Sequence, residues 1–242
     1  MTIQSERQSA VKKFIRRLIP SRVQAARICL KILESDYGYK NSIETQSSVD
    51  GKGNPIPWFA YPAIEYIKQL DLSEKVIFEY GSGNSTLFWE TRAKRVMSIE
   101  HDEKWFNKMK TLVSPSTELK LISDNSYPDE ILKIDENFDV IIIDGRCRYD
   151  CATAAVKKLK NGGIIILDDS DWFPNTTRVL REANLIQVDL SGFAPINLHI
   201  HTTSFFLHRD FDFKPIYNEQ PQNIIGSIKR PFSMGDVSVK ND

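Results

Sequence analysis

The sequence predicts an α/β protein in which helices cover both faces of a mostly parallel sheet. From Pro57 onward, short β-rich runs alternate with helical patterns. Two of the runs, Val140–Ile143 and Ile164–Leu167, are wholly apolar, as expected of strands that are buried on both faces. A pair of glycines, Gly81 and Gly83, follows an earlier run and precedes a helical pattern, a position at which backbone can approach a ligand closely.

Each element follows from local patterning. Seven strands are expected at Val76–Glu79, Arg95–Ile99, Leu119–Ile122, Val140–Ile143, Ile164–Leu167, Ile186–Leu190 and Thr203–Leu207. Helices are expected between them, at roughly 61–70, 84–93, 102–112, 150–160 and 174–183. The Asn-Gly-Gly stretch at 161–163 is expected to end a helix and lead straight into the next strand.

The chain divides into three predicted regions. Residues 1–56 form a basic amphipathic helical extension followed by a polar loop at 41–57, residues 57–208 form the sheet domain, and residues 209–242 form an irregular tail. Residues 1–31 hold eight Lys and Arg against a single acid. A basic amphipathic helix can lie on an anionic membrane surface. It can equally pack on its own domain or against a twin subunit in a homodimer.

Composition limits the class of protein. The 242 residues are 41% hydrophobic and 26% charged, which is typical of a soluble globular chain. The net charge is zero, so the chain outside the basic extension is acidic, which argues against nucleic acid as a partner. The first residues lack the apolar stretch of a secretory signal, and the three cysteines are read as reduced thiols. The expected location is the cytoplasm, and association with a membrane through the basic helix is the alternative.

The neighbours of the glycine pair distinguish two kinds of ligand. A dinucleotide fold needs G-x-G-x-x-G, but the third glycine position is occupied by Thr86. The sequence instead reads acid-x-G-x-G, with Glu79 before Gly81, Ser82 and Gly83. S-adenosylmethionine carries an ammonium group and no phosphate. A carboxylate at Glu79 can serve that ammonium directly or through water.

The next strand adds a second acid. Glu100 ends this strand 17 residues after Gly83, where the tip of the neighbouring strand should lie, with His101 beside it. A carboxylate at that position can accept both ribose hydroxyls of a nucleoside. Asp124, after the third strand, falls where a loop would reach the adenine. The alternatives are a helix-capping acid at Glu100 and a turn residue at Asp124.

Four segments together resemble a known family. "FEYGSGNST", "VMSIEHD", "FDVIIIDGR" and "LKNGGIIILDDSD" are similar, in order and spacing, to the strand-end motifs of class I S-adenosylmethionine-dependent methyltransferases. The resemblance covers residues 57–208 and includes a poorly characterised bacterial subgroup. It implies a Rossmann-like, doubly wound sheet of seven strands whose last strand runs antiparallel. The sequence departs from the common pattern at Ser85, where many members have a third glycine.

The reacting group is expected beyond the carboxyl ends of strands four and five. Asp144 is a candidate for cofactor contact, for the general base and for an acceptor anchor, and Arg146 and Tyr149 are candidate acceptor contacts. Asp144, Asp168 and Asp169 together can bind a divalent cation such as Mg²⁺. The resemblance supports such a site, because metal-dependent O-methyltransferases place acids at these strand ends, although the catechol type has asparagine where this chain has Asp169.

Two further groups of residues are expected at the same edge. His199 and His201 are two residues apart and so point to one side of an extended chain, as candidates for acceptor contact or proton removal. Local hydrogen bonding is the alternative for both. Trp58 and Tyr61, beside Pro57, can face a sulfonium cation or the acceptor, and the alternative is packing of the entry helix on the sheet.

The function expected from the sequence is S-adenosylmethionine-dependent methylation, on oxygen, of a small molecule or saccharide. Two alternatives stay open at this point. One is a non-catalytic module that keeps the fold and serves as a binding partner in glycan assembly. The other is an NAD-dependent oxidoreductase, against which Thr86 counts.

Overall fold

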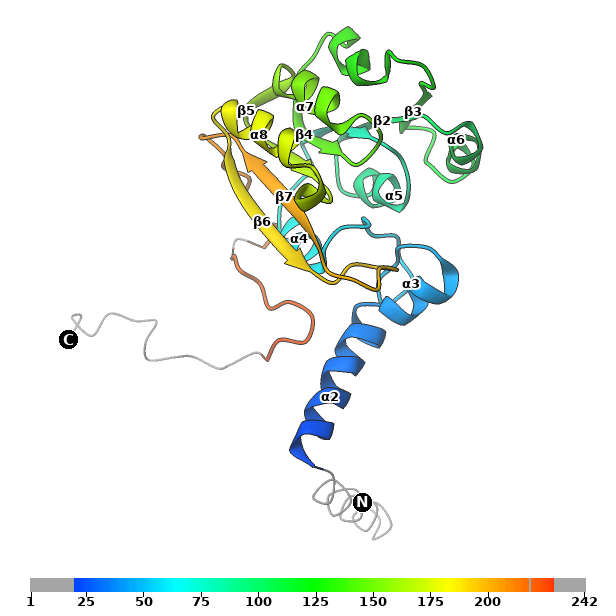
Figure 1. Cartoon of the computed structure of the whole chain (residues 1–242), viewed down its shortest axis with the longest axis vertical. Coiled ribbons are helices and arrows are strands. Elements are labelled where there is room, and N and C mark those ends of the chain that lie inside the picture. Colours follow the sequence, from blue (N-terminus) through cyan, green and yellow to red (C-terminus); the bar gives the residue numbers. More distant parts are fainter. Residues whose placement is uncertain (1–19, 218, 229–242) are drawn as a thin grey trace, which may run out of the picture.

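The computed structural model describes residues 20–217 and 219–228, and a single seven-stranded sheet forms their centre (Figure 1). The strand order is β3-β2-β1-β4-β5-β7-β6. β1 to β5 pair in parallel, and β7 lies antiparallel between β5 and β6. The strands span Val76–Tyr80 (β1), Arg95–Glu100 (β2), Glu118–Leu121 (β3), Phe138–Ile143 (β4), Leu159–Leu167 (β5), Ile186–Gly192 (β6) and His201–Leu207 (β7).

This topology is the class I methyltransferase fold, and it confirms the predicted fold class. All seven predicted strands are present, and each differs from its predicted bounds by at most a few residues, apart from the start of β5. The order turns back between β1 and β4, which is the kind of switch point where open α/β sheets bind ligands beyond their carboxyl ends.

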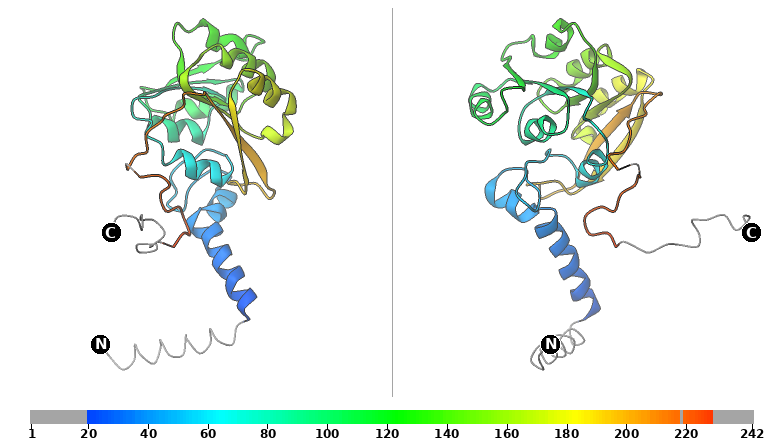
Figure 2. Two further views of the ribbon diagram at one scale, coloured as in Figure 1. Left: turned by 90° about the vertical axis from the view of Figure 1, so that its left-hand side faces the viewer. Right: turned by 180° about the vertical axis from the view of Figure 1, so that it is seen from behind.

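Helices cover both faces of the sheet (Figures 1 and 2). The apolar side chains of the central strands alternate between two cores: Val140 and Ile142 face one, and Ile141 and Ile143 face the other. The first core is completed by α4 (Tyr61–Ile67) and α5 (Asn84–Glu90). The second is completed by η2 (Tyr127–Lys133), α7 (Arg148–Val156) and α8 (Pro174–Glu182). α6 (Glu103–Lys110) lies against β2 and β3.

The helix expected over 150–160 was predicted with the wrong end. α7 ends at Val156 and β5 begins at Leu159, so Asn161, Gly162 and Gly163 lie inside the strand. The β4–β5 register shifts at this point, and Gly162 has a left-handed backbone with φ of 77°. A Cβ on Gly163 would lie 2.8 Å from the carbonyl oxygen of Asp139. The glycines therefore allow an irregular strand to pass close to its neighbour, and they do not cap a helix.

The predicted polar loop at 41–57 is also helical in its first part. α3 spans Tyr39–Thr45, and a single bridge between Val49 and Pro55 closes the turn that follows. The serine hydroxyl of Ser42 is buried and donates to the carbonyl of Val49 at 2.9 Å. The polar composition predicted a loop because this helix is short and is stabilised by side-chain hydrogen bonds such as that of Ser42.

The N-terminal extension is seen from residue 20, so the part of the predicted basic helix at 11–19 lies outside the described residues. α2 (Ser21–Lys31) follows Pro20 and runs into a π-helical turn, η1 (Ile32–Asp36). α2 has no buried residue and projects from the body of the protein (Figure 1). Contact of the amphipathic helix at 11–19 with lipid, with its own domain or with a second subunit therefore stays a prediction. Within the described chain, no helix has the length and apolar character needed to span a bilayer.

Candidate active site at the carboxyl ends of the strands

A cavity of about 520 Å³, called here the main cavity, opens at the carboxyl edge of the sheet. Its walls come from the β1, β4 and β5 ends, from α6, from the entry segment before α4 and from the β6–β7 connection. The lining residues are Trp58, Ser82, Trp105, Asp144, Arg148, Asp168, Asp169, Trp172, Asn197, His199 and His201. A smaller space of about 130 Å³, the glycine-loop hollow, lies beside it and shares four of these residues: Trp58, Ser82, Trp105 and Asp144.

The turn after β1, residues 81–85, is called here the glycine loop, and it packs closely against the end of β4. Gly81 has φ of 100°, and a Cβ there would lie 2.8 Å from the carbonyl oxygen of Asp144. Only glycine meets both conditions without strain. Ser82, Gly83 and Ser85 then line the glycine-loop hollow, as the predicted ligand-binding role of this turn requires.

Glu79 is buried and lies behind the loop, lining neither space. Its carboxylate accepts hydrogen bonds from Thr86 Oγ1 at 2.5 Å, Ser98 Oγ at 2.9 Å and Trp89 Nε1 at 3.1 Å. Burial raises its pKa to about 7. Thr86 Oγ1 also accepts from the backbone N–H of Gly83 at 3.0 Å, so the residue at the third glycine position ties the acid to the loop. Glu79 therefore stabilises the loop from its interior side. In this arrangement its carboxylate does not face the space where the ammonium group of a cofactor would lie.

Glu100 ends β2 and is also buried, as predicted for a strand-tip acid. Its Oε2 accepts from the backbone N–H of Ser82 at 3.1 Å and from the Ser82 hydroxyl at 2.8 Å. Its Oε1 accepts from the backbone N–H groups of His101 at 2.7 Å and Asp102 at 2.9 Å. All four lone-pair positions of the carboxylate are therefore in use. A ribose hydroxyl would have to replace the Ser82 hydroxyl at Oε2.

Three other predicted residues of this side lie outside both spaces. The His101 ring packs edge-on against Tyr127, with ring centres 5.9 Å apart. Asp124 is a turn residue: its carboxylate accepts hydrogen bonds from the Ser126 side chain and from the Ser126 N–H at 2.8 Å, and these bonds lower its pKa. Arg146 donates to the carbonyl of Ser123 at 3.0 Å and so turns away from the main cavity. Asp124 forms the turn that is its alternative, and Arg146 does not line the main cavity, so the ligand contacts expected of both stay predictions.

Arg148 links the ends of β4 and β5. Its guanidinium donates to Asp144 Oδ1 at 3.0 Å and lies 3.5 Å from Asp169 Oδ2. It also donates to the backbone carbonyl of Gly145 at 3.1 Å and stacks over the ring of Phe173 at 4.6 Å. Burial raises the pKa of Asp144 to about 6, although the nearby guanidinium opposes the shift. One fixed cation therefore stands between two carboxyls.

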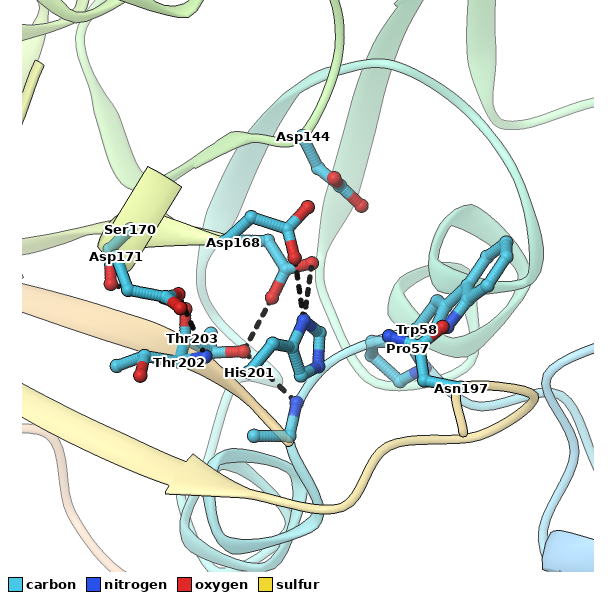
Figure 3. Close-up of polar contacts among 12 residues, drawn as sticks. Pro57, Trp58, Asp144, Asp168, Ser170, Asp171, Asn197, His201, Thr202 and Thr203 are labelled. Atoms are coloured by element: carbon cyan, nitrogen blue, oxygen red, sulfur yellow. Dashed lines mark hydrogen bonds and ion pairs between the residues drawn. The ribbon is translucent and has the colours of Figure 1, made fainter. Parts of the chain in front are cut away.

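Asp168 is buried and tied to the interior. Its Oδ1 accepts from Thr203 Oγ1 at 2.5 Å, and that hydroxyl accepts from the backbone N–H of Ala60 at 3.0 Å. Burial, together with the charges of Asp144 and Asp169, raises the pKa of Asp168 well above its ordinary value. This chain of bonds joins β5, β7 and the entry segment behind the main cavity (Figure 3).

His201 lies at the start of β7 and is only 1% exposed. Its Nδ1 lies 2.6 Å from Asp169 Oδ1 and 4.0 Å from Asp168 Oδ2 (Figure 3). Its other ring nitrogen, Nε2, is buried and has no hydrogen-bond partner in the described structure. Asp169 has a left-handed backbone with φ of 50°, so the chain turns between Asp168 and Asp169 and both side chains reach the cavity. This is the turn that the sequence requires for both acids to serve one site.

The predicted metal site is present only in part. A set of ligand atoms within 4.8 Å of one another comes from Asp168, Asp169 and His201, and Asp144 is not among them. The donor types suit a divalent cation. However, His201 Nδ1 is already paired with Asp169, and Arg148 is ion-paired with the same carboxylate.

Of the two aromatic residues predicted to contact the ligand, Trp58 lies at the cavity surface and Tyr61 lies in the core. Trp58 lines both spaces, and its indole N–H donates to the side-chain oxygen of Asn197 at 3.0 Å. Tyr61 is buried in the core against Tyr37, with ring centres 4.6 Å apart, so it packs the entry helix and does not reach the cavity. His199 lines the main cavity and stacks on Trp172, with ring centres 5.8 Å apart.

Four cavity residues were not among the predicted site residues: Trp105, Arg148, Trp172 and Asn197. Trp105 and Trp172 each follow a strand-end acid by a few residues, and large apolar side chains at that position are a usable signal. The position of Arg148 after the fourth strand indicates either recognition of an acidic group on the acceptor or pairing with nearby acids, and the structure shows the pairing. No pattern marks Asn197, because it lies in an irregular connection.

No protein-family model matches the chain, and no curated protein matches it. Solved structures with a similar fold include a precorrin-6y C5,15-methyltransferase from Geobacter metallireducens (14% identity, 61% of this chain and 87% of that one, TM-score 0.48). Others are a methyltransferase-like protein from Silicibacter pomeroyi (22%, 64% and 89%, 0.44) and the N-methyltransferase NodS from Bradyrhizobium japonicum with S-adenosyl-L-homocysteine (16%, 56% and 78%, 0.40). Values this low carry no information about activity. The strand order defines the fold class.

Proposed function

We propose that the protein is an S-adenosylmethionine-dependent methyltransferase that methylates a hydroxyl oxygen of a small molecule or saccharide. The observation that supports this most directly is the pairing of His201 with Asp169 at the wall of the main cavity. Nδ1 of the imidazole is engaged and Nε2 is free, which is the arrangement of a general base oriented by a carboxylate. The fold supplies the other half of the argument, since the glycine loop faces the same space.

The cofactor fits the glycine-loop side of the site. Ser82, Gly83 and Ser85 would contact its amino-acid portion, and Glu100 would hold the ribose after exchanging the Ser82 hydroxyl. Trp105 donates its indole N–H to the carbonyl of Ser82 at 2.7 Å, so its ring forms a fixed wall beside the loop. When bound, S-adenosylmethionine would supply a sulfonium methyl group whose carbon is attacked directly by an oxygen nucleophile, with S-adenosylhomocysteine as the leaving group.

The chain's own residues supply the proton chemistry. His201 Nε2 would accept the proton of the acceptor hydroxyl as the new bond to oxygen forms, and the imidazolium would be stabilised by Asp169 at Nδ1. Asp144 would accept a second hydrogen bond from the acceptor and hold it in line. Arg148 would keep Asp144 and Asp169 apart and in place.

The glycine loop also argues against the oxidoreductase alternative. The third glycine position carries the Thr86 hydroxyl, which is bonded to both Glu79 and the Gly83 N–H. A pyrophosphate site needs a close helix-to-strand approach at this point, and Thr86 fills it.

Three measurements test the proposal. Calorimetry with S-adenosylmethionine should show binding, and a titration with NADH should show none. A screen of hydroxylated acceptors should then release S-adenosylhomocysteine. Binding of NADH but not of S-adenosylmethionine would overturn the proposal. S-adenosylmethionine binding without turnover on any acceptor would favour the non-catalytic module.

A further inference from the structure

A third space adjoins the main cavity on the side away from the glycine loop. This outer hollow has a volume of about 370 Å³. It shares Arg148 and Trp172 with the main cavity and adds Tyr149 from the start of α7, Phe173 just before α8 and Asn175 from the first turn of α8. Because they share these residues, the two spaces adjoin each other, and together they are called here the path.

Large aromatic side chains stand exposed along this path. Trp172 is 58% exposed, Tyr149 52% and Trp58 45%, although rings of this size are normally buried. Two of them are held in fixed orientations: Trp58 by its bond to Asn197, and Trp172 by stacking on His199. The stacked His199 covers one face of Trp172. The exposed fraction shows that much of the remaining ring surface is open.

The path also carries an excess of carboxyl groups. Asp144, Asp168 and Asp169 line the main cavity, and the one Arg or Lys among its lining residues, Arg148, is already ion-paired with two of them. An anionic acceptor would meet this excess with no free cation to pair with. A ligand with many hydroxyl donors would instead satisfy carboxylate acceptors.

A sugar ring combines the two required properties. Its C–H face is apolar and stacks on an aromatic ring, and its rim consists of hydroxyl groups. The outer hollow alone, of about 370 Å³, exceeds what one sugar unit fills, so it has room for a unit beyond the one at the main cavity. Resting on the proposed function, we infer that the acceptor is a neutral oligosaccharide. Its reacting unit lies at His201, and its next unit lies on Trp172 in the outer hollow.

The test compares acceptors that differ by one sugar unit. Methyl glycosides of common hexoses and the matching disaccharides are assayed for methyl transfer with the full-length protein. The disaccharide should have a kcat/KM about tenfold above that of its monosaccharide, as expected for one additional stacked ring. Trp172→Ala and Tyr149→Ala should bring this ratio close to one, and Trp172→Phe should retain most of it.

A matched control and a second readout keep the outcomes separate. Tyr217→Ala removes a ring that is 71% exposed and lines none of the three spaces, so the ratio should stay at the wild-type value. Binding of the disaccharides without cofactor is followed by calorimetry, which depends neither on turnover nor on the Trp172 indole. If calorimetry finds no S-adenosylmethionine binding, the proposed function fails, yet disaccharide binding lost in Trp172→Ala would still support the subsite.

Three results would overturn the inference. One is equal kcat/KM on mono- and disaccharides in the wild type. Another is a ratio that Trp172→Ala leaves unchanged. The third is a panel in which no disaccharide binds or is methylated, whether or not simple phenols or acidic sugars are.

Discussion

The two sides of the cavity differ in how fully their buried polar groups are hydrogen-bonded. On the glycine-loop side, Glu79 and Glu100 accept seven hydrogen bonds between them, three and four respectively. On the side formed by β4, β5 and β7, His201 has a free Nε2, and Asp169 sits in a left-handed backbone conformation. The two carboxylates of the first side are fully hydrogen-bonded, although His101 Nδ1 beside Glu100 has no hydrogen-bond partner, whereas the second side leaves the imidazole of its His201–Asp169 pair bonded at one nitrogen alone. They are called here the closed side and the open side.

The difference indicates what each side does. A satisfied network fixes the shape of a loop and prepares a binding surface before the ligand arrives. An unpartnered buried nitrogen costs stability, and at the wall of a cavity a substrate can supply the missing partner. Crowded carboxyls with raised pKa values and backbone strain concentrate at reacting sites for the same reason. We therefore expect substitutions on the open side to change turnover and those on the closed side to change binding and stability.

The largest expected effect is on turnover at His201. His201→Gln keeps a similar volume but supplies no base, so kcat should fall by about 10²- to 10⁴-fold, the usual contribution of a positioned general base. The dissociation constant for S-adenosylmethionine should change little, because His201 lines only the main cavity. Asp169→Asn is the matched variant, since it weakens the partner of Nδ1 while leaving the imidazole in place. A His201→Gln enzyme with wild-type kcat would remove His201 from the mechanism.

The next effect is on the pH dependence of stability through Glu79. Its folded-state pKa of about 7 lies above the ordinary 4.5, so the folded protein holds a proton that the unfolded chain releases. The stabilisation is present below pH 4.5 and is lost as the pH rises through 7, a change on the order of 3 kcal/mol. Burial raises the pKa values of Asp144 and Asp168 as well, so their contributions have the same sign.

Glu79→Gln should therefore flatten part of this dependence. Urea unfolding at pH 5 and pH 8 should show a wild-type protein that is less stable at the higher pH and a variant that loses less. Glu74→Gln, at an exposed position, is the control and should leave the curve unchanged. A variant that is destabilised equally at both pH values would show that Glu79 is charged in the folded state.

A smaller effect is expected on cofactor affinity at Glu100. Glu100→Gln keeps the shape but removes the charge from hydrogen bonds worth about 1.5–3 kcal/mol each, so affinity for S-adenosylmethionine should fall about tenfold. Since Glu100 also holds Ser82 and the turn after β2, a melting curve must accompany the calorimetry. Ser82→Ala removes the hydroxyl that the ribose would displace, so it should bind the cofactor at least as well as the wild type. An unchanged dissociation constant in Glu100→Gln would exclude Glu100 from the site.

The sequence predicted the fold far better than it predicted the site. Strands such as Val140–Ile143 are specified by local runs of apolar residues, and parallel strands of an open sheet bring their ends to one edge. Residues directly at those ends, such as Asp144 and Asp168, were therefore found. His199 and His201 were also placed correctly, because their connection returns to the same edge.

The sequence did not predict the direction in which the side chains point. Arg146 and Arg148 are two residues apart after the same strand, yet Arg146 turns to the carbonyl of Ser123 while Arg148 enters the cavity. Cys147 between them has a left-handed backbone with φ of 53°, so the chain is not extended there. The pairing of His201 with Asp169 depends likewise on a left-handed residue that no local pattern indicates.

The smallest expected effect is that of metal removal, and here the open side of the site is tested directly. A divalent cation shared by Asp144 and Asp169 would lie beside the guanidinium of Arg148, which is 3.0 Å and 3.5 Å from their carboxylate oxygens. Two cations at such a separation repel, and the guanidinium already supplies the charge that a metal would bring. Methyl transfer should therefore proceed at the wild-type rate in EDTA and should not rise when Mg²⁺ is added. Arg148→Gln should lower kcat by disordering both carboxyls, and added Mg²⁺ should restore part of that loss. Activity that disappears in EDTA, returns with Mg²⁺ and is lost in Asp144→Asn would instead establish a metal enzyme and would give Arg148 a purely structural role.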